Sequence, residues 1–111
     1  MYGAAKVELR NQHGIPVIAL DGEITGELQA PVQDVFQKID LQQSGRVIID
    51  FSRAVYINSS GIAILIDLVN QCQSSDTLME FASLNDQIYK IMDLVGLFEF
   101  VRVWPELKDA Y

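Results

Sequence analysis

The segment from Arg46 to Phe51, RVIIDF, restricts the fold of this 111-residue chain more than any other feature. It is a continuous run of mostly β-branched and apolar residues, which is typical of a central strand covered on both faces. Apolar residues recur at helical spacing in the segments before and after it. Single strands between helices imply crossover connections, and these produce a parallel or mixed sheet. The sequence therefore predicts an α/β fold.

Strands and helices alternate along the whole chain, and no internal repeat or long linker separates them. Strands are predicted at residues 6–10, 15–20, 46–51, 77–82 and 98–103. Helices are predicted at residues 28–39, 61–73 and 85–95, with a short turn or helix at 105–111. The first two strands form an antiparallel hairpin, and Gly96 ends the last long helix. We therefore predict one domain, residues 1–111, whose mixed, mostly parallel sheet of four to five strands packs with three to four helices.

Two of the predicted helices carry apolar stripes that we expect to face the core. The first stripe consists of Ile62, Leu65, Ile66, Val69 and Cys72, and the second of Ile88, Ile91, Met92 and Val95. The first turns of the earlier helix are apolar almost all round, so this helix either packs on two sides or presents apolar surface to a partner. The pattern leaves open whether helices cover one face of the sheet or both.

Charge and residue usage exclude several classes of function. The chain has 15 acidic and 8 basic residues, a formal net charge of -7, and this charge repels nucleic-acid phosphates and anionic lipids. The lone Cys72 excludes an internal disulfide and a multi-cysteine metal site, and the lone His13 excludes a histidine-rich metal centre. No signal peptide or membrane-spanning run is recognisable. We expect a cytoplasmic protein with no metal, no cofactor and no direct nucleic-acid or membrane partner.

Two serines lie where a buried strand gives way to a helix. Ser59 and Ser60 follow Asn58 at the predicted start of that helix. A helix N-terminus has unpaired N–H groups and a partial positive charge, which favour a phosphate on a serine at this place. Gly61 has no side chain, so another backbone can approach closely. Asn and Ser are also common N-caps, and these residues alone favour capping over phosphorylation.

A catalytic role for these serines is not supported by their surroundings. A nucleophilic serine on a strand-to-helix turn requires the pattern Gly-x-Ser-x-Gly, an acid and a histidine. Ile57 stands where the first glycine of that pattern would precede Ser59, and the one histidine lies in the predicted hairpin turn. The acidic residues Asp21, Glu23 and Glu27 are typical of a solvated loop rather than of a catalytic pair. We therefore predict that the protein is not an enzyme.

Three segments together resemble the STAS domain, and specifically the bacterial anti-sigma factor antagonists. The run from Asp50 to Ile62 is similar to that family's signature, in which the element D-S-S-G follows the central strand. Residues 20–24, LDGEI, resemble the family's second-strand ending, L-x-G-E-L-D. Residues 94–98, LVGLF, resemble a late G-L element between the third helix and the last strand. The three segments occur in the family's order and span nearly the whole chain.

This resemblance implies a partner-switching protein. Its unphosphorylated form would bind an anti-sigma factor that is also a serine kinase of the histidine-kinase-like ATPase type, and this binding would release a sigma factor. The kinase would phosphorylate the first serine of the element, which is Ser59 here, and so end the complex. A metal-dependent serine phosphatase would restore binding. The residues expected to contact the partner are Glu23, Thr25, Asn58, Ser59, Ser60, Gly61 and Ile62.

The chain departs from the family pattern at two positions. Asn58 replaces the aspartate before the phosphorylated serine, which keeps an N-cap but removes a charge, and Thr25 replaces the aspartate after G-E-L. The first departure motivates an alternative, a constitutive, non-phosphorylated STAS subunit of a transport or signalling complex. A small-molecule or nucleotide sensor is a third alternative, although no glycine-rich phosphate loop is present.

Overall fold

A computed structural model describes residues 5–111, and the predicted domain boundary at residue 1 lies outside them. Within this range, five strands form one sheet: β1 (Lys6–Gln12), β2 (Ile15–Ile24), β3 (Arg46–Ile57), β4 (Leu78–Ala82) and β5 (Arg102–Trp104). The helices in the same range are α1 (Gln29–Phe36), α2 (Leu41–Ser44), α3 (Ser59–Ser74) and α4 (Asp86–Leu94). Short 3-10 turns are η1 (Gly26–Leu28), η2 (Leu97–Glu99) and η3 (Leu107–Ala110). None of the helices described here has both the length and the apolar character needed to cross a membrane.

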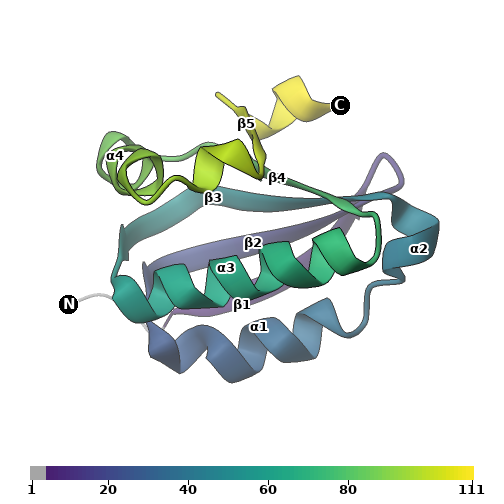
Figure 1. Ribbon diagram of the computed structural model, residues 1–111, viewed down its shortest axis with the longest axis horizontal. Coiled ribbons are helices and arrows are strands. Elements are labelled where there is room, and N and C mark those ends of the chain that lie inside the picture. Colours follow the sequence, from purple (N-terminus) through teal and green to yellow (C-terminus); the bar gives the residue numbers. More distant parts are fainter. Residues whose placement is uncertain (1–4) are drawn as a thin grey trace.

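The strands follow one another across the sheet in the order β1-β2-β3-β4-β5. β1 and β2 form an antiparallel hairpin, whereas the pairs β2–β3, β3–β4 and β4–β5 are parallel. The parallel strands are joined by crossover segments that contain the helices (Figure 1). This arrangement confirms the predicted single α/β domain with a mixed, mostly parallel sheet.

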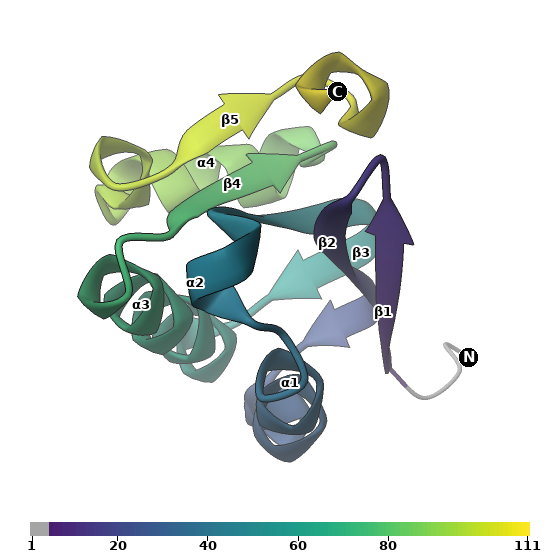
Figure 2. The same cartoon turned by 90° about the vertical axis from the view of Figure 1, so that its right-hand side faces the viewer.

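The main core lies between the sheet and the helices. Its buried residues include Ile49 and Phe51 of β3 and Leu65 of α3, and α1 and α3 lie side by side over this face (Figure 2). On the opposite face, Ile48 of β3 packs with Ala110 of η3 in a second, smaller cluster. The helices therefore cover one face of the sheet, and the C-terminal turn covers part of the other.

A buried ion pair fixes the C-terminal turn to the sheet. Glu80 of β4 is 1% exposed and accepts hydrogen bonds from Arg46 Nε at 2.6 Å and from Arg46 Nη2 at 2.8 Å. Trp104 Nε1 donates to the same carboxylate at 2.7 Å. Arg46 Nη2 also donates to the carbonyl oxygen of Ala110 at 2.9 Å. Burial raises the pKa of Glu80, but these hydrogen bonds outweigh burial and hold the pKa below its ordinary value.

Several strand boundaries differ from those predicted, and β1 and β2 continue to Gln12 and Ile24 instead of ending at residues 10 and 20. β3 continues to Ile57 instead of ending at Phe51, because its second half stays paired with the end of β2, where the register shifts twice. This half alternates polar and apolar residues irregularly, so the apolar run did not reveal it. The last strand covers only 102–104 instead of 98–103, because Gly96 adopts φ +78 and starts η2, which buries Leu97.

The apolar stripes of two helices are shifted from their predicted positions. In α3, Ile64 and Leu68 are buried, whereas Ile66, predicted to face the core, is 43% exposed. In α4, Met92 is buried as predicted, but Val95 lies after the helix and is 48% exposed. Both errors arise because apolar residues flank the buried stripe, and spacing alone does not decide which of them faces the sheet. The remaining stripe residues are buried or half-buried, and burial raises the pKa of the Cys72 thiol to about 11.

Candidate functional site

The predicted switch serines lie at the first turn of α3, directly after β3. The side-chain oxygen of Asn58 accepts a hydrogen bond from Gly61 N at 2.9 Å, and the Asn58 carbonyl accepts one from Ile62 N at 2.9 Å. Asn58 is therefore the N-cap of α3, as predicted. Ser59 and Ser60 are the first two helical residues, and both are exposed. This turn contains no acidic residue, so no side-chain charge of the turn itself offsets the positive end of the helix dipole.

Gly61 fixes the start of α3 against the end of β2. A β-carbon at this position would lie 2.8 Å from the carbonyl carbon of Ile24 and still closer to its oxygen. The same Ile24 oxygen accepts a hydrogen bond from Asn58 N at 3.2 Å. The close backbone approach predicted at Gly61 is thus made by the chain itself. Gly61 is buried by this internal packing, and its predicted contact with a partner stays a prediction.

A shallow groove of about 280 Å³ runs beside the exposed serines, between η1 and α1 on one side and α3 on the other. Its lining residues are Gly26, Gln29, Gln33, Ser60, Ala63, Ile64 and Asp67. Asp67 of α3 accepts hydrogen bonds from Gln33 of α1 and from Gln71 of α3, both at 2.9 Å. The bond from Gln33 links the two helices that line the groove. Sequence reasoning did not identify this groove. The available signal was the spacing of Ser60, Ala63 and Asp67 along one face of α3.

The end of β2 brings two further predicted residues to the same edge of the sheet. Glu23 is paired in register with Tyr56, and both are exposed. Thr25 is half-buried and caps η1, because its hydroxyl oxygen accepts a hydrogen bond from Glu27 N at 3.4 Å. The structure therefore places Glu23, Thr25 and the first turn of α3 at one edge, together with Ile62, which is half-buried. Tyr56, 42% exposed, is a neighbour that the sequence did not single out.

Two other ionisable residues, His13 and Arg53, contact neighbours outside the first turn of α3. His13 lies in the exposed hairpin turn, where its ring contacts that of Tyr111 with centroids 4.3 Å apart. Arg53 Nη1 lies 4.0 Å from an oxygen of Asp21. Within residues 5–111, no three His, Cys, Asp or Glu side chains are placed to hold a metal ion.

Alanine in place of Asn58 is expected to lower the free energy of unfolding by about 1 kcal/mol, because the Gly61 N–H loses its capping acceptor. Asn58→Asp keeps that acceptor and adds a charge that the helix dipole favours, so its stability should equal or slightly exceed that of the wild type. Urea unfolding measures both changes. The matched control is Asn70→Ala, at an exposed position within α3. Equal stability of Asn58→Ala and the wild type would contradict the cap.

The chain matches a model of a known protein family. A family model described as the STAS domain matches residues 6–110. No protein with a curated description matches the chain significantly.

Solved structures share the fold at low sequence identity. An anti-sigma factor antagonist from Mycobacterium paratuberculosis superposes with a TM-score of 0.82 at 18% identity, over 96% of this chain and 91% of the other. A sulfate transporter family protein from Wolinella succinogenes gives 0.78 at 18% identity, over 89% and 83%. The phosphorylated form of the Bacillus cell fate determinant SpoIIAA gives 0.70 at 17% identity, over 96% of each chain. At these identities the likeness shows the fold alone.

Proposed function

The chain belongs to the STAS domain family, and we propose that it is an anti-sigma factor antagonist that is switched off by phosphorylation of Ser59. The observation that carries this proposal is the exposed Ser59 at the first position of a capped helix, directly after the central strand. The fold shared with a phosphorylated antagonist-type protein supports it. In this account the protein is a binding module and a kinase substrate, not an enzyme, and it acts in the cytoplasm.

The unphosphorylated surface suits a protein partner. Around Ser59 it offers the half-buried Ile62, the exposed Tyr56 and the groove beside Ser60. An anti-sigma factor that is also a serine kinase of the histidine-kinase-like ATPase type would cover this edge and release its sigma factor. Ser59, Tyr56 and Ile62 carry no charge, so burying them under a partner costs less than burying a charged group would.

A phosphate on Ser59 changes this balance. It adds a charge of about -1.5 to -2 and three strongly hydrated oxygens. In the free protein, the N–H groups and dipole at the start of α3 stabilise that charge. In the complex it must be desolvated or excluded, and a penalty of roughly 3 kcal/mol weakens binding more than a hundredfold. A metal-dependent serine phosphatase would then restore the binding form.

Replacement of Ser59 separates modification from binding. Candidate kinases of the histidine-kinase-like ATPase type from the same genome are incubated with ATP and each variant. We expect the kinase to phosphorylate the wild type and Ser60→Ala, but not Ser59→Ala. We also expect Ser59→Asp to weaken kinase binding by about tenfold or more, and less than a phosphate does, because aspartate carries less charge.

The matched control is Ser74→Asp, which places the same charge at an exposed position at the far end of α3 and should bind like the wild type. Titration calorimetry with the kinase measures each affinity. Binding of Ser59→Asp at wild-type affinity would contradict a charge switch at this position, and labelling of Ser59→Ala would assign the phosphate to another residue.

A constitutive, non-phosphorylated subunit is the second candidate function. Two observations favour it: Asn58 stands in place of the family's aspartate, and a sulfate transporter family protein shares the fold. This candidate predicts that Ser59 stays unmodified with every kinase tested. It also predicts that the chain copurifies with components of a transport or signalling complex, whichever of the Ser59 variants is used.

A further inference from the structure

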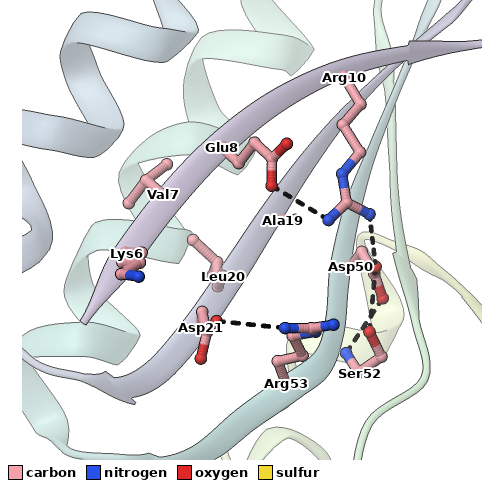
Figure 3. A pocket seen from close by; sticks show the side chains of 10 residues that line it. All are labelled: Lys6, Val7, Glu8, Arg10, Ala19, Leu20, Asp21, Asp50, Ser52 and Arg53. Atoms are coloured by element: carbon pink, nitrogen blue, oxygen red, sulfur yellow. Dashed lines mark hydrogen bonds and ion pairs between the residues drawn. The ribbon is translucent and has the colours of Figure 1, made fainter. Parts of the chain in front are cut away.

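A second candidate site lies on the face of the sheet that α1 and α3 do not cover. A hollow of about 440 Å³ lies over β1, β2 and β3, next to the part of this face that η3 covers. Figure 3 shows the side chains that line it. A volume of this size suits a small molecule rather than a macromolecule. The hollow contains none of the residues of the Ser59 edge.

The lining of the hollow carries balanced charge. Three cationic side chains, Lys6, Arg10 and Arg53, and three carboxylates, Glu8, Asp21 and Asp50, surround it, with Ser52 between them. Such a balance is unusual in a chain of net charge -7, because three of its eight basic residues gather here. A balanced site has no net field to attract a polyanion, but it can hold a ligand that carries both signs.

Two of the ion pairs in the hollow are too widely separated for a direct hydrogen bond. Arg10 Nη2 donates to Glu8 at 3.1 Å, and this hydrogen bond lowers the pKa of Glu8. In contrast, Arg10 Nη1 and Asp50 are 4.0 Å apart, and so are Arg53 Nη1 and Asp21. Both separations exceed hydrogen-bonding distance. The facing charges therefore retain unused hydrogen-bonding capacity, and a ligand group can bind beside them.

Asp50 is the most constrained of these groups. Its side chain is 4% exposed, and its two oxygens accept hydrogen bonds from Ser52 N at 3.0 Å and Ser52 Oγ at 3.2 Å. A carboxylate has about four acceptor sites, so two remain for a ligand. A buried charge is costly unless it is paired, and the Arg10 guanidinium lies too far away to donate directly. Sites for small ligands place such convergent polar groups in a hollow of this kind.

We propose that this hollow binds a zwitterionic small molecule of the α-amino acid class, with the ligand ammonium on Asp50 and the ligand carboxylate on Arg53. Arg53 is suited to the second role because its side chain is 75% exposed and its contact with Asp21 is loose. Figure 3 shows the Arg53 guanidinium extending toward Ser52 and Asp50, so both ends of a small ligand find partners within one hollow. This site does not depend on the proposed Ser59 switch.

Amide NMR titration of the intact chain tests the site with defined probes. These are glycine, L-serine, L-glutamate and L-lysine, and, for comparison, acetate, methylammonium and inorganic phosphate. We expect at least one amino acid to shift the signals of Glu8, Ala19 and residues 50–53 in a saturable way. Acetate and methylammonium should bind more weakly than that amino acid, because each satisfies one end of the site, and phosphate should leave these signals unchanged.

Two variants and one control decide whether the hollow is the binding site. Asp50→Asn removes the charge at the base of the hollow, and Arg53→Gln removes an exposed cation with little consequence for folding. Each is expected to weaken binding by about tenfold or more. Lys90→Gln, which removes an exposed cation on α4, should bind like the wild type. No saturable shift with any amino acid, undiminished binding by Arg53→Gln, or equal binding of phosphate would overturn the proposal.

Discussion

Gly61→Ala is expected to lower the free energy of unfolding by about 3 kcal/mol, although alanine is the better helix former. Helix propensity alone predicts a gain of about 1 kcal/mol for this substitution inside α3. The added β-carbon, however, would overlap the carbonyl oxygen and carbon of Ile24. These are backbone atoms, so they cannot rotate away as a flexible side chain can. Separating α3 from β2 disturbs a buried contact, and because the overlap is with backbone we expect a packing penalty of about 4 kcal/mol, above the usual range of about 1–3 kcal/mol. The packing penalty therefore exceeds the gain in propensity.

Thermal and urea unfolding of Gly61→Ala measure this change. A loss of about 3 kcal/mol corresponds to a melting temperature lower by roughly 10 °C or more for a domain of this size. The control is Ser60→Ala, one residue earlier in the same turn and exposed, which should lie within about 0.5 kcal/mol of the wild type. If Gly61→Ala were more stable than the wild type, the close approach of α3 to Ile24 would be wrong.

Arg46→Ala is expected to produce a loss of similar size, about 3 kcal/mol, through a different cause. It leaves the Glu80 carboxylate buried with Trp104 as its remaining donor among the contacts described above, and it removes the hydrogen bond to Ala110. Removing one partner of a buried ion pair typically costs about 3–5 kcal/mol. We expect the lower end of that range, because the Arg46 side chain is 33% exposed and water screens part of the interaction.

The pH dependence of this loss identifies its origin. The folded-state pKa of Glu80 lies below its unfolded value, so the pair stabilises the protein above the unfolded pKa. That contribution disappears as the pH falls through the folded pKa. The difference between the wild type and Arg46→Ala should therefore be full at neutral pH and shrink below about pH 4.

Two further variants separate charge from packing at this ion pair. Replacing both partners, Arg46→Met with Glu80→Leu, should recover much of the stability, because no uncompensated charge remains buried. Lys90→Ala removes an exposed cation of α4, away from this ion pair, and serves as the control. A constant loss at all pH values, unrelieved in the double variant, would show that the pair is not the cause.

The fold was predictable because its signals are local. The apolar run of β3 and the helical spacing around it predict the α/β class, although not which faces the helices cover. The caps Asn58 and Asn85 mark helix starts that the structure confirms. The second half of β3 was not predictable, since its strand conformation depends on pairing with β2 rather than on its own composition. The same holds for Ile66, because only the packing of α3 decides which apolar residues stay exposed.

The position of the two serines in the candidate site was predictable from the sequence, whereas the contacts around them were not. A strand end followed by capping residues locates Ser59 and Ser60 from the sequence. The contact between Gly61 and Ile24 joins segments distant in the chain, and the missing side chain alone did not identify its partner. The hollow on the sheet face that α1 and α3 do not cover was not predictable either. Its charged residues alternate along β1, and the others come from β2 and β3, so the pattern is equally typical of a solvated surface.

The most direct test of the account is the intact mass, with site mapping, of the protein isolated from its native cells during growth and under stress. We predict a species heavier by one phosphoryl group, with the phosphate on Ser59 and an abundance that changes with the condition. We also predict that the unphosphorylated species alone copurifies with a kinase-type anti-sigma factor. A chain that remains unmodified at Ser59 under every condition, or a phosphorylated form that stays in the complex, would contradict the switch.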